Sequence, residues 1–376
     1  MLHSDVVRQA SARLQPEAEL LLGCTGANIS DTWAIRFQAL LDEALDWDAL
    51  LTLAMQHGVL PLLYWHLDRV DTASVPQATY EQLRSYFYAN KLHNRRLTDK
   101  LLELLRLFEA QNITALPFKG PTLAVVAYDN LDLRQFGDLD ILVPERDCGV
   151  AMQLLMSEGF RLKSTEMKIR EEMTQLSRCA YSFIHDADDI SVDLHWGITA
   201  AMEYPDCTFA LPLDVIGVWE RVESVSLDGG RVSSFAPEDL LLLLSIHGSK
   251  HCWERLGWLS DIVHLIDAYP EMPWSRIRAR ASHLGCRRMF DLGLLLAHTT
   301  CGVGLPESAW QEVQTEAVVQ SLAKIVQQAW FHNADSEAGM VARSLFYLRM
   351  RERWRDKVQY GMWLAKLVVK TQVSNR

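Results

Sequence analysis

The sequence lacks the features that mark membrane and secreted proteins. Its longest apolar runs, such as the five leucines at 240–244, fall far short of the roughly 20 residues that cross a bilayer. The N-terminus has neither the basic start nor the apolar core of a signal peptide. The seven cysteines are scattered, odd in number and free of any CxxC pair, which argues against a disulfide framework. These absences predict a cytoplasmic protein with no transmembrane segment.

Positive charge is also in short supply. The chain carries 37 Lys and Arg residues against 48 Asp and Glu residues, a formal net charge of -11. A surface that grips nucleic acid by neutralising phosphates needs the opposite balance, so we do not expect a nucleic-acid partner. The 376 residues, 49% of them hydrophobic and 23% charged, are ordinary for a globular protein of two domains or of one domain with large helical additions.

Hydrophobic periodicity divides the chain into three parts. Apolar residues recur at helical spacing in the first part, which includes a long helix expected from Gln77 to Gln111. The pattern turns helical again at Pro237, where a proline and two acids open the leucine run. We therefore predict an α+β protein with an N-terminal helical region at 1–111, a β-containing core at 112–236 and a C-terminal helical domain at 237–376.

The core contains short β-prone runs separated by turn signals and helices. Lys119-Gly120-Pro121 favours a tight turn followed by a helix that runs to about Tyr128. The other elements expected in this part are two strands at 113–118 and 138–143, a helix at 145–158 and two hairpins at 181–196 and 222–235. This order predicts a short mixed sheet covered by helices.

Two aspartates in the second of these strands form the most informative feature. Side chains alternate along a strand, so Asp138 and Asp140 share one face. Two like charges side by side are destabilising unless a divalent metal, an Arg or a Lys lies between them. Asp193 projects from the polar face of a later strand, and three carboxylates on one sheet face would suit Mg²⁺ or Mn²⁺. The alternative is an exposed strand edge with solvated acids.

Several basic residues near the acids admit two interpretations. Lys119 and Gly120, before a helix N-terminus, form a candidate phosphate cradle, although Lys119 could instead pair with an acid. Arg134 would either touch phosphate or neutralise the acids. His195 shares the face of Asp193 and is either a base for an acceptor hydroxyl or a hydrogen-bonded structural partner.

Two later features give weaker signals. His247 and His251 are spaced like zinc ligands on a helix, but Gly248 replaces the glutamate of a metalloprotease motif, so we expect them to line a cleft or pack on the sheet. From Arg343 to Lys370 the chain predicts a basic amphipathic helix, which either packs its apolar face on the body or binds a partner.

Four ordered segments together resemble the uncharacterised nucleotidyltransferase family of the polymerase-β-like superfamily. They are Phe118-Lys119-Gly120, residues 133–143 (LRQFGDLDILV), residues 192–196 (VDLHW) and residues 247–261 (HGSKHCWERLGWLSD). The resemblance implies a minimal nucleotidyltransferase fold, a short mixed β-sheet with helices. Lys119-Gly120-Pro121 departs from the Gly-Ser turn common in the superfamily.

The resemblance also implies roles for the acids and a reaction. Asp138 and Asp140 would hold the metal bound to a nucleoside triphosphate, and Asp193 would help hold a second metal that activates an acceptor hydroxyl. A nucleoside monophosphate would be transferred and pyrophosphate released. We expect ATP as the nucleotide and a small molecule, peptide or protein as the acceptor; the alternatives are a catalytically silent nucleotide-binding regulator and a partner-binding scaffold.

Overall fold

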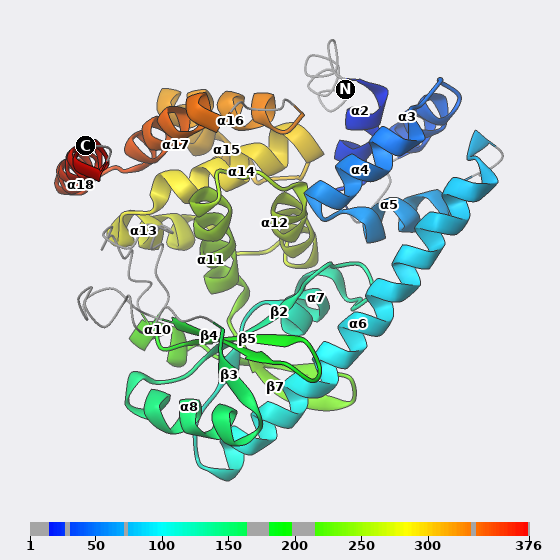
Figure 1. Cartoon of the computed structure of the whole chain (residues 1–376). Coiled ribbons are helices and arrows are strands. Elements are labelled where there is room, and N and C mark those ends of the chain that lie inside the picture. Colours follow the sequence, from blue (N-terminus) through cyan, green and yellow to red (C-terminus); the bar gives the residue numbers. More distant parts are fainter. Residues whose placement is uncertain are drawn as a thin grey trace.

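A single long helix connects the two ends of the molecule. The computed structural model describes residues 15–26, 31–70, 74–163, 180–197, 215–331 and 336–374. Helix α6 (Gln77–Ala110) runs from the N-terminal helices along the side of the sheet (Figure 1). It begins at the expected residue and ends within one residue of the expected position. The element thus ties the sheet to the helical part of the protein.

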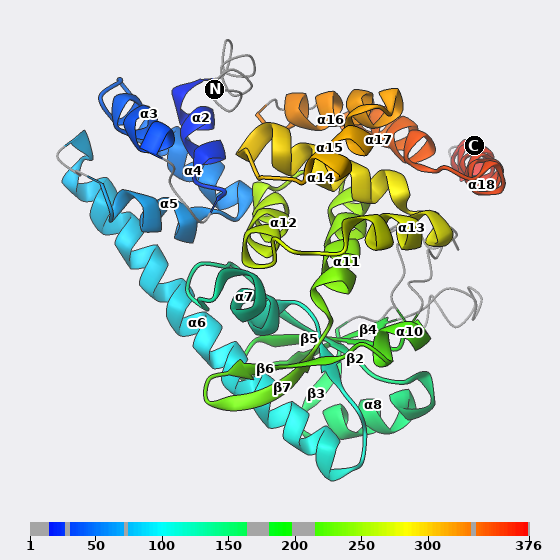
Figure 2. The same cartoon turned by 180° about the vertical axis from the view of Figure 1, so that it is seen from behind.

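The sheet is mixed and five-stranded. Its strands are β1 (Leu116–Pro117), β2 (Asp138–Leu142), β3 (Phe160–Leu162), β4 (Ala180–His185) and β5 (Ile190–His195), in the order β1-β2-β5-β4-β3. Only β2 and β5 pair in parallel. A separate hairpin of β6 (Glu223–Leu227) and β7 (Gly230–Ser234) lies beside helix α7 (Gly120–Tyr128), as the view from behind shows (Figure 2). These elements confirm the predicted α+β class.

The two faces of the sheet are chemically different. On one face Leu139, Ile141, Val192 and Leu194 are buried in a cluster that also contains apolar residues of α6 and of α8 (Cys148–Ser157). Alternation along the strands places Asp138, Asp140, Asp193 and His195 on the other face. Packing of the apolar face therefore fixes which side chains the opposite face presents.

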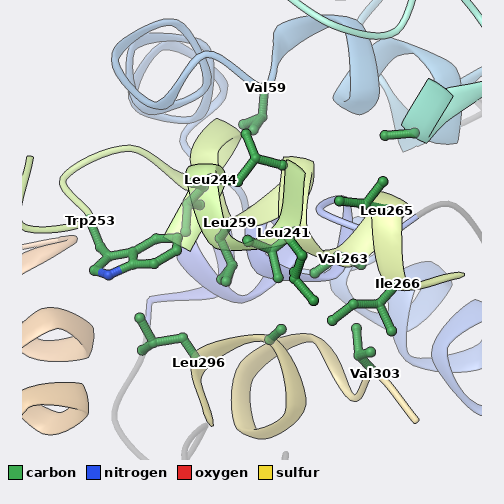
Figure 3. Close-up of a cluster of buried hydrophobic side chains, with 14 of the residues drawn as sticks. Val59, Leu241, Leu244, Trp253, Leu259, Val263, Leu265, Ile266, Leu296 and Val303 are labelled. Atoms are coloured by element: carbon green, nitrogen blue, oxygen red, sulfur yellow. The ribbon is translucent and has the colours of Figure 1, made fainter. Parts of the chain in front are cut away.

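Helices from both ends of the chain share a second, larger core. The N-terminal helices are α2 (Pro16–Gly23), α3 (Asp31–Leu41), α4 (Trp47–His57) and α5 (Leu60–Leu67). The helices after the core are α11 (Pro237–Lys250), α12 (Leu256–Ala268), α13 (Trp274–Leu284), α14 (Arg287–Cys301), α15 (Glu307–Gln314), α16 (Ala317–Ala329), α17 (Ser336–Met350) and α18 (Trp354–Ser374). Val59 lies in one buried cluster with Leu244, Leu259 and Leu296 (Figure 3). The two helical ends thus pack against each other.

Two element boundaries in the core differ from the prediction. The strand expected at 113–118 is shorter, because Asn112 adopts a left-handed conformation and the Ile113 amide still donates to the Phe108 carbonyl at the end of α6. The helix expected at 145–158 opens as a 3-10 turn at Glu145–Asp147 before α8. A short helix, α10 (Val215–Trp219), precedes the β6–β7 hairpin.

The prediction of one continuous basic helix from Arg343 to Lys370 is wrong, because two helices cover this segment. Helix α17 ends at Met350. The Arg288 guanidinium donates hydrogen bonds to the carbonyl oxygens of Arg349 and Arg351, which a longer helix would use for its own backbone hydrogen bonds. Arg351 is 5% exposed and its guanidinium lies over the Tyr360 ring, whereas Trp354 is 75% exposed. The expectation that charged residues face solvent while apolar residues pack on the body is therefore reversed at Arg351 and Trp354.

Among the helices that the structure describes, none is long and apolar enough to span a bilayer.

Candidate functional site

The paired aspartates and the third acid meet where β2 and β5 run in parallel. The register places Asp140 opposite Asp193, with Asp138 opposite Ser191 and Leu142 opposite His195. Residues in register on one sheet face have side chains that lie next to each other. The strand that carries Asp193 therefore lies beside the strand that carries Asp138 and Asp140, as a shared site requires, and Asp140 and Asp193 lie directly side by side.

Three side chains are close enough to share one cation. Ligand atoms of Asp140, Asp193 and His195 all lie within 4.8 Å of one another. Asp138 is not in this group and is exposed at the start of β2. Desolvation by the surrounding protein and the neighbouring charge of Asp140 raise the pKa of Asp138 above its usual value. The structure thus gathers Asp140, Asp193 and His195 most tightly and leaves Asp138 outside that group, near the charges of both other acids.

Asp140 is 4% exposed and only half of its carboxylate is satisfied. Lys119 Nζ lies 3.1 Å from Oδ1, and His195 Nε2 lies 3.1 Å from the same oxygen. Burial opposes ionisation, but these two partners outweigh it and hold the pKa of Asp140 well below its usual range. The second oxygen, Oδ2, is buried with no hydrogen-bond partner among the residues that the structure describes. A buried carboxylate oxygen of this kind can accept a cation.

The turn before α7 brings backbone close to the aspartate strand. Gly120 has a φ of +51°, and a Cβ there would lie 3.2 Å from the Asp138 carbonyl oxygen. Glycine is therefore required both for the left-handed conformation and for the close approach. Within the first turn of the helix, the Thr122 hydroxyl is buried and has no hydrogen-bond partner in the described part of the chain. The N-terminus of α7, with its free amides, thus lies against the strand that carries the acids.

Arg134 is fixed by a buried carboxylate from the C-terminal part. Its Nε and Nη2 donate to Asp261 Oδ1 at 2.8 Å and Oδ2 at 3.0 Å, and Tyr128 donates to the same carboxylate at 2.7 Å. Asn94 of α6 donates to the Arg134 carbonyl at 2.8 Å. The remaining nitrogen, Nη1, is buried and has no hydrogen-bond partner within the described ranges. Arg134 is thus held in place with one donor unused.

His247 and His251 lie close together, as their spacing predicts. Their ring centroids are 4.8 Å apart, and Trp258 lies 5.4 Å from the first and 4.9 Å from the second. His251 follows directly after the last residue of α11. Burial and then the charge of Lys119 push the pKa of His247 well below its ordinary value, and burial lowers that of His251 to about 4. Both rings are therefore neutral near pH 7, and His247 is near the charges of the acidic site.

Sequence reasoning missed the residues that support this arrangement. No motif in the sequence indicates Tyr128, Asn94 or the pairing of Asp261 with Arg134. Asn94 gives one usable signal, because it is a polar residue on the apolar stripe of α6 between Phe87 and Leu97. Tyr128 gave none, since its partner is 133 positions away in the sequence.

A mixed sheet that carries paired aspartates beside a Lys-Gly turn and a helix N-terminus is the kind of site expected of a nucleotide-transferring enzyme. The profile of the family described as "Uncharacterised nucleotidyltransferase" matches residues 43–302, well over half of the chain, so this protein belongs to that family. Membership supports transferase activity with a nucleotide substrate. Comparison with curated proteins and with solved structures finds no match.

Proposed function

We propose that this protein is a metal-dependent nucleotidyltransferase that transfers a nucleoside monophosphate from ATP to an acceptor hydroxyl and releases pyrophosphate. The acceptor is a small molecule, peptide or protein. The proposal assigns the minimal nucleotidyltransferase fold to residues 112–236, with helical regions at 1–111 and 237–376. The observation that carries it is the buried, unpartnered Oδ2 of Asp140 directly beside Asp193.

The residues present fit a hard divalent cation. Mg²⁺ and Mn²⁺ prefer carboxylate oxygens, which Asp138, Asp140 and Asp193 supply. When bound, such ions stabilise the attacking and leaving oxygens of an in-line displacement. His195 already lies 3.1 Å from Oδ1 of Asp140, so its role in this proposal is to orient that carboxylate.

Three groups are available for the phosphates. Lys119 supplies a point charge, the α7 N-terminus at Gly120 supplies amides and the positive end of a helix dipole, and Arg134 supplies its unused Nη1. Because Lys119 contacts Asp140 directly, it can balance the acid before a nucleotide arrives and a phosphate afterwards. Asp261 keeps Arg134 oriented throughout.

The acceptor side of the proposed site is formed by α11 and the residue after it. Neutral imidazoles of His247 and His251 can each donate and accept one hydrogen bond. The two imidazoles and the Trp258 ring form a surface with both polar and apolar groups. Such a surface suits an acceptor that carries a hydroxyl on a partly apolar skeleton.

The first test is binding of a non-hydrolysable ATP analogue with and without Mn²⁺. We expect metal-dependent binding by the wild type, its loss in Asp193→Asn, and its retention in Asp186→Asn, a matched change in an acid 60% exposed at a hairpin turn. Equal binding by all three proteins would overturn the metal assignment.

The second test is transfer of label from α-labelled ATP to acceptors in a cell extract, together with pyrophosphate release. Metal-dependent transfer that Asp193→Asn abolishes supports the enzyme. Tight nucleotide binding with no transfer to any acceptor would favour the silent regulator.

A further inference from the structure

A cavity lined by arginines lies at the opposite end of α11 from His247 and His251. Its volume is about 250 Å³, and it is lined by Arg221, Glu238, Leu242, Arg276, Ile277 and Arg280. Glu238 is nine residues before His247, a separation of roughly 14 Å along a helix. The cavity is therefore separate from the proposed nucleotide site.

The ion pairs around this cavity leave positive charge in excess. Arg221 and Arg280 both pair with Asp239, which is 1% exposed, and Arg276 Nη2 lies 2.7 Å from Glu238 Oε1. Among the described residues, these ion pairs set three guanidinium groups against two carboxylates, so the paired set itself carries one net positive charge. In addition, Nη2 of Arg280 is buried and has no hydrogen-bond partner among the described residues.

A nearby arginine cluster shows what a purely structural arrangement looks like. Arg278, Arg287 and Arg288 are matched by four carboxylates, those of Asp291, Glu312, Glu316 and Glu352. The acids there outnumber the bases by four to three. The cavity differs because it combines excess positive charge, an unused buried donor and open volume.

We propose that this cavity binds a small phosphate-bearing anion. Guanidinium groups bind phosphate through paired, planar donors, and one unused donor with a spare charge suits a single phosphate group. Leu242 and Ile277 provide an apolar wall for a short carbon skeleton. The volume lies just below the range of about 300–1,000 Å³ typical of sites for larger organic ligands. The ligand class is therefore inorganic phosphate or a phosphate monoester of a few carbons.

The test is calorimetric titration of the full chain with inorganic phosphate and, separately, with glycerol 3-phosphate, without nucleotide or metal. Arg276 is 72% exposed at its side chain, so Arg276→Ala should fold normally. Loss of a charge-assisted contact should weaken phosphate binding about tenfold or more. Arg95→Ala is the matched control, because Arg95 is also exposed and makes one ion pair, with Asp228.

A Lys119→Ala background separates this cavity from the nucleotide site. Phosphate binding that persists in Lys119→Ala and falls in the Lys119→Ala, Arg276→Ala double variant supports the proposal. Tighter binding of glycerol 3-phosphate than of phosphate identifies an ester site, and equal binding identifies an inorganic phosphate site. Loss of all phosphate binding in Lys119→Ala alone, or unchanged binding in Arg276→Ala, would overturn it.

Discussion

Two buried aspartates in this protein have the same charge and opposite surroundings. Asp291 of α14 is 0% exposed, and Arg278 donates to both of its oxygens, at 3.0 and 3.1 Å. Arg287 adds a third contact at 3.4 Å. Asp140 of β2 is 4% exposed, but Lys119 and His195 both contact Oδ1, and Oδ2 has no hydrogen-bond partner in the described structure.

The difference separates a structural charge from a functional one. A buried carboxylate with both oxygens satisfied gains nothing from a further ligand, and removing it leaves its arginines unpaired. The second oxygen of Asp140, which has no hydrogen-bond partner among the described residues, is free to take a further positive ligand. On this basis we propose that Asp291 holds helices together and that Asp140 is a cation ligand.

The largest expected effect is on catalysis at the site formed by Asp140 and Asp193. Asp193→Asn removes the acid opposite Asp140, and we expect pyrophosphate release to fall at least ~10³-fold, since several kcal/mol of transition-state stabilisation depends on the ion. Urea unfolding should change little, because Asp193 is only half-buried. Normal turnover by Asp193→Asn would contradict a metal site at Asp140 and Asp193, and with it the proposed difference between Asp140 and Asp291.

The next largest effect is on the free energy of unfolding, through the ion pairs of Asp291. Asp291→Asn leaves Arg278 and Arg287 facing a neutral amide, and it should lower the free energy of unfolding by about 3 kcal/mol. Nucleotide binding per folded molecule should be unchanged. Glu312→Gln, which breaks an ion pair of the same Arg278 at an acid 49% exposed, is the control and should lower stability by less than ~1 kcal/mol. Equal losses in the two variants would contradict the structural role of Asp291.

A third buried ionisable group, His264, makes the stability of the fold depend on pH. Burial lowers the pKa of His264 to about 3, so its ring is neutral in the folded state, whereas the unfolded chain takes up a proton below about pH 6.5. This histidine therefore removes stability as pH falls from 6.5 toward 3, at about 1.4 kcal/mol per pH unit.

His264→Phe should flatten that slope. Phenylalanine keeps the stacking of ring 264 on Tyr128 (centroids 3.9 Å apart) but cannot take up a proton. Urea unfolding at pH 7 and pH 5 should give a difference smaller by about 2 kcal/mol in the variant. An unchanged difference would mean that other groups set the acid sensitivity.

The smallest effect concerns the turn beside the acids. Gly120→Ala places a Cβ 3.2 Å from the Asp138 carbonyl at a positive φ, and it should lower stability by about 1–2 kcal/mol and weaken nucleotide binding. Gly137→Ala is the control, because no atom lies within 4 Å of a Cβ at that position. If the two variants behave alike, the close approach of the turn is not what requires glycine.

Local patterns predicted the parts of this site that depend on alternation. The period of two placed Asp138 and Asp140 on one face and put Asp193 on the polar face of its strand, and the parallel register then brought Asp140 and Asp193 together. The Lys-Gly-Pro turn was readable because glycine and proline restrict the backbone locally.

Distant pairings could not be read in the same way. Arg134 and Asp261 are 127 positions apart, so no spacing rule connects them, and their pairing depends on how α12 packs on α7. The break after Met350 is set by Arg288, 61 positions before Arg349, whereas periodicity alone predicted one continuous helix. What escaped prediction is tertiary in origin.

Mn²⁺ titration followed by electron paramagnetic resonance tests the central contrast most directly. The wild type, Asp140→Asn and Asp291→Asn would be compared without nucleotide, with folding of each variant checked by circular dichroism. We predict that Asp140→Asn weakens Mn²⁺ binding about tenfold or more, as expected when a metal-site group is lost, while Asp291→Asn binds like the wild type. Wild-type Mn²⁺ affinity in Asp140→Asn would contradict the account.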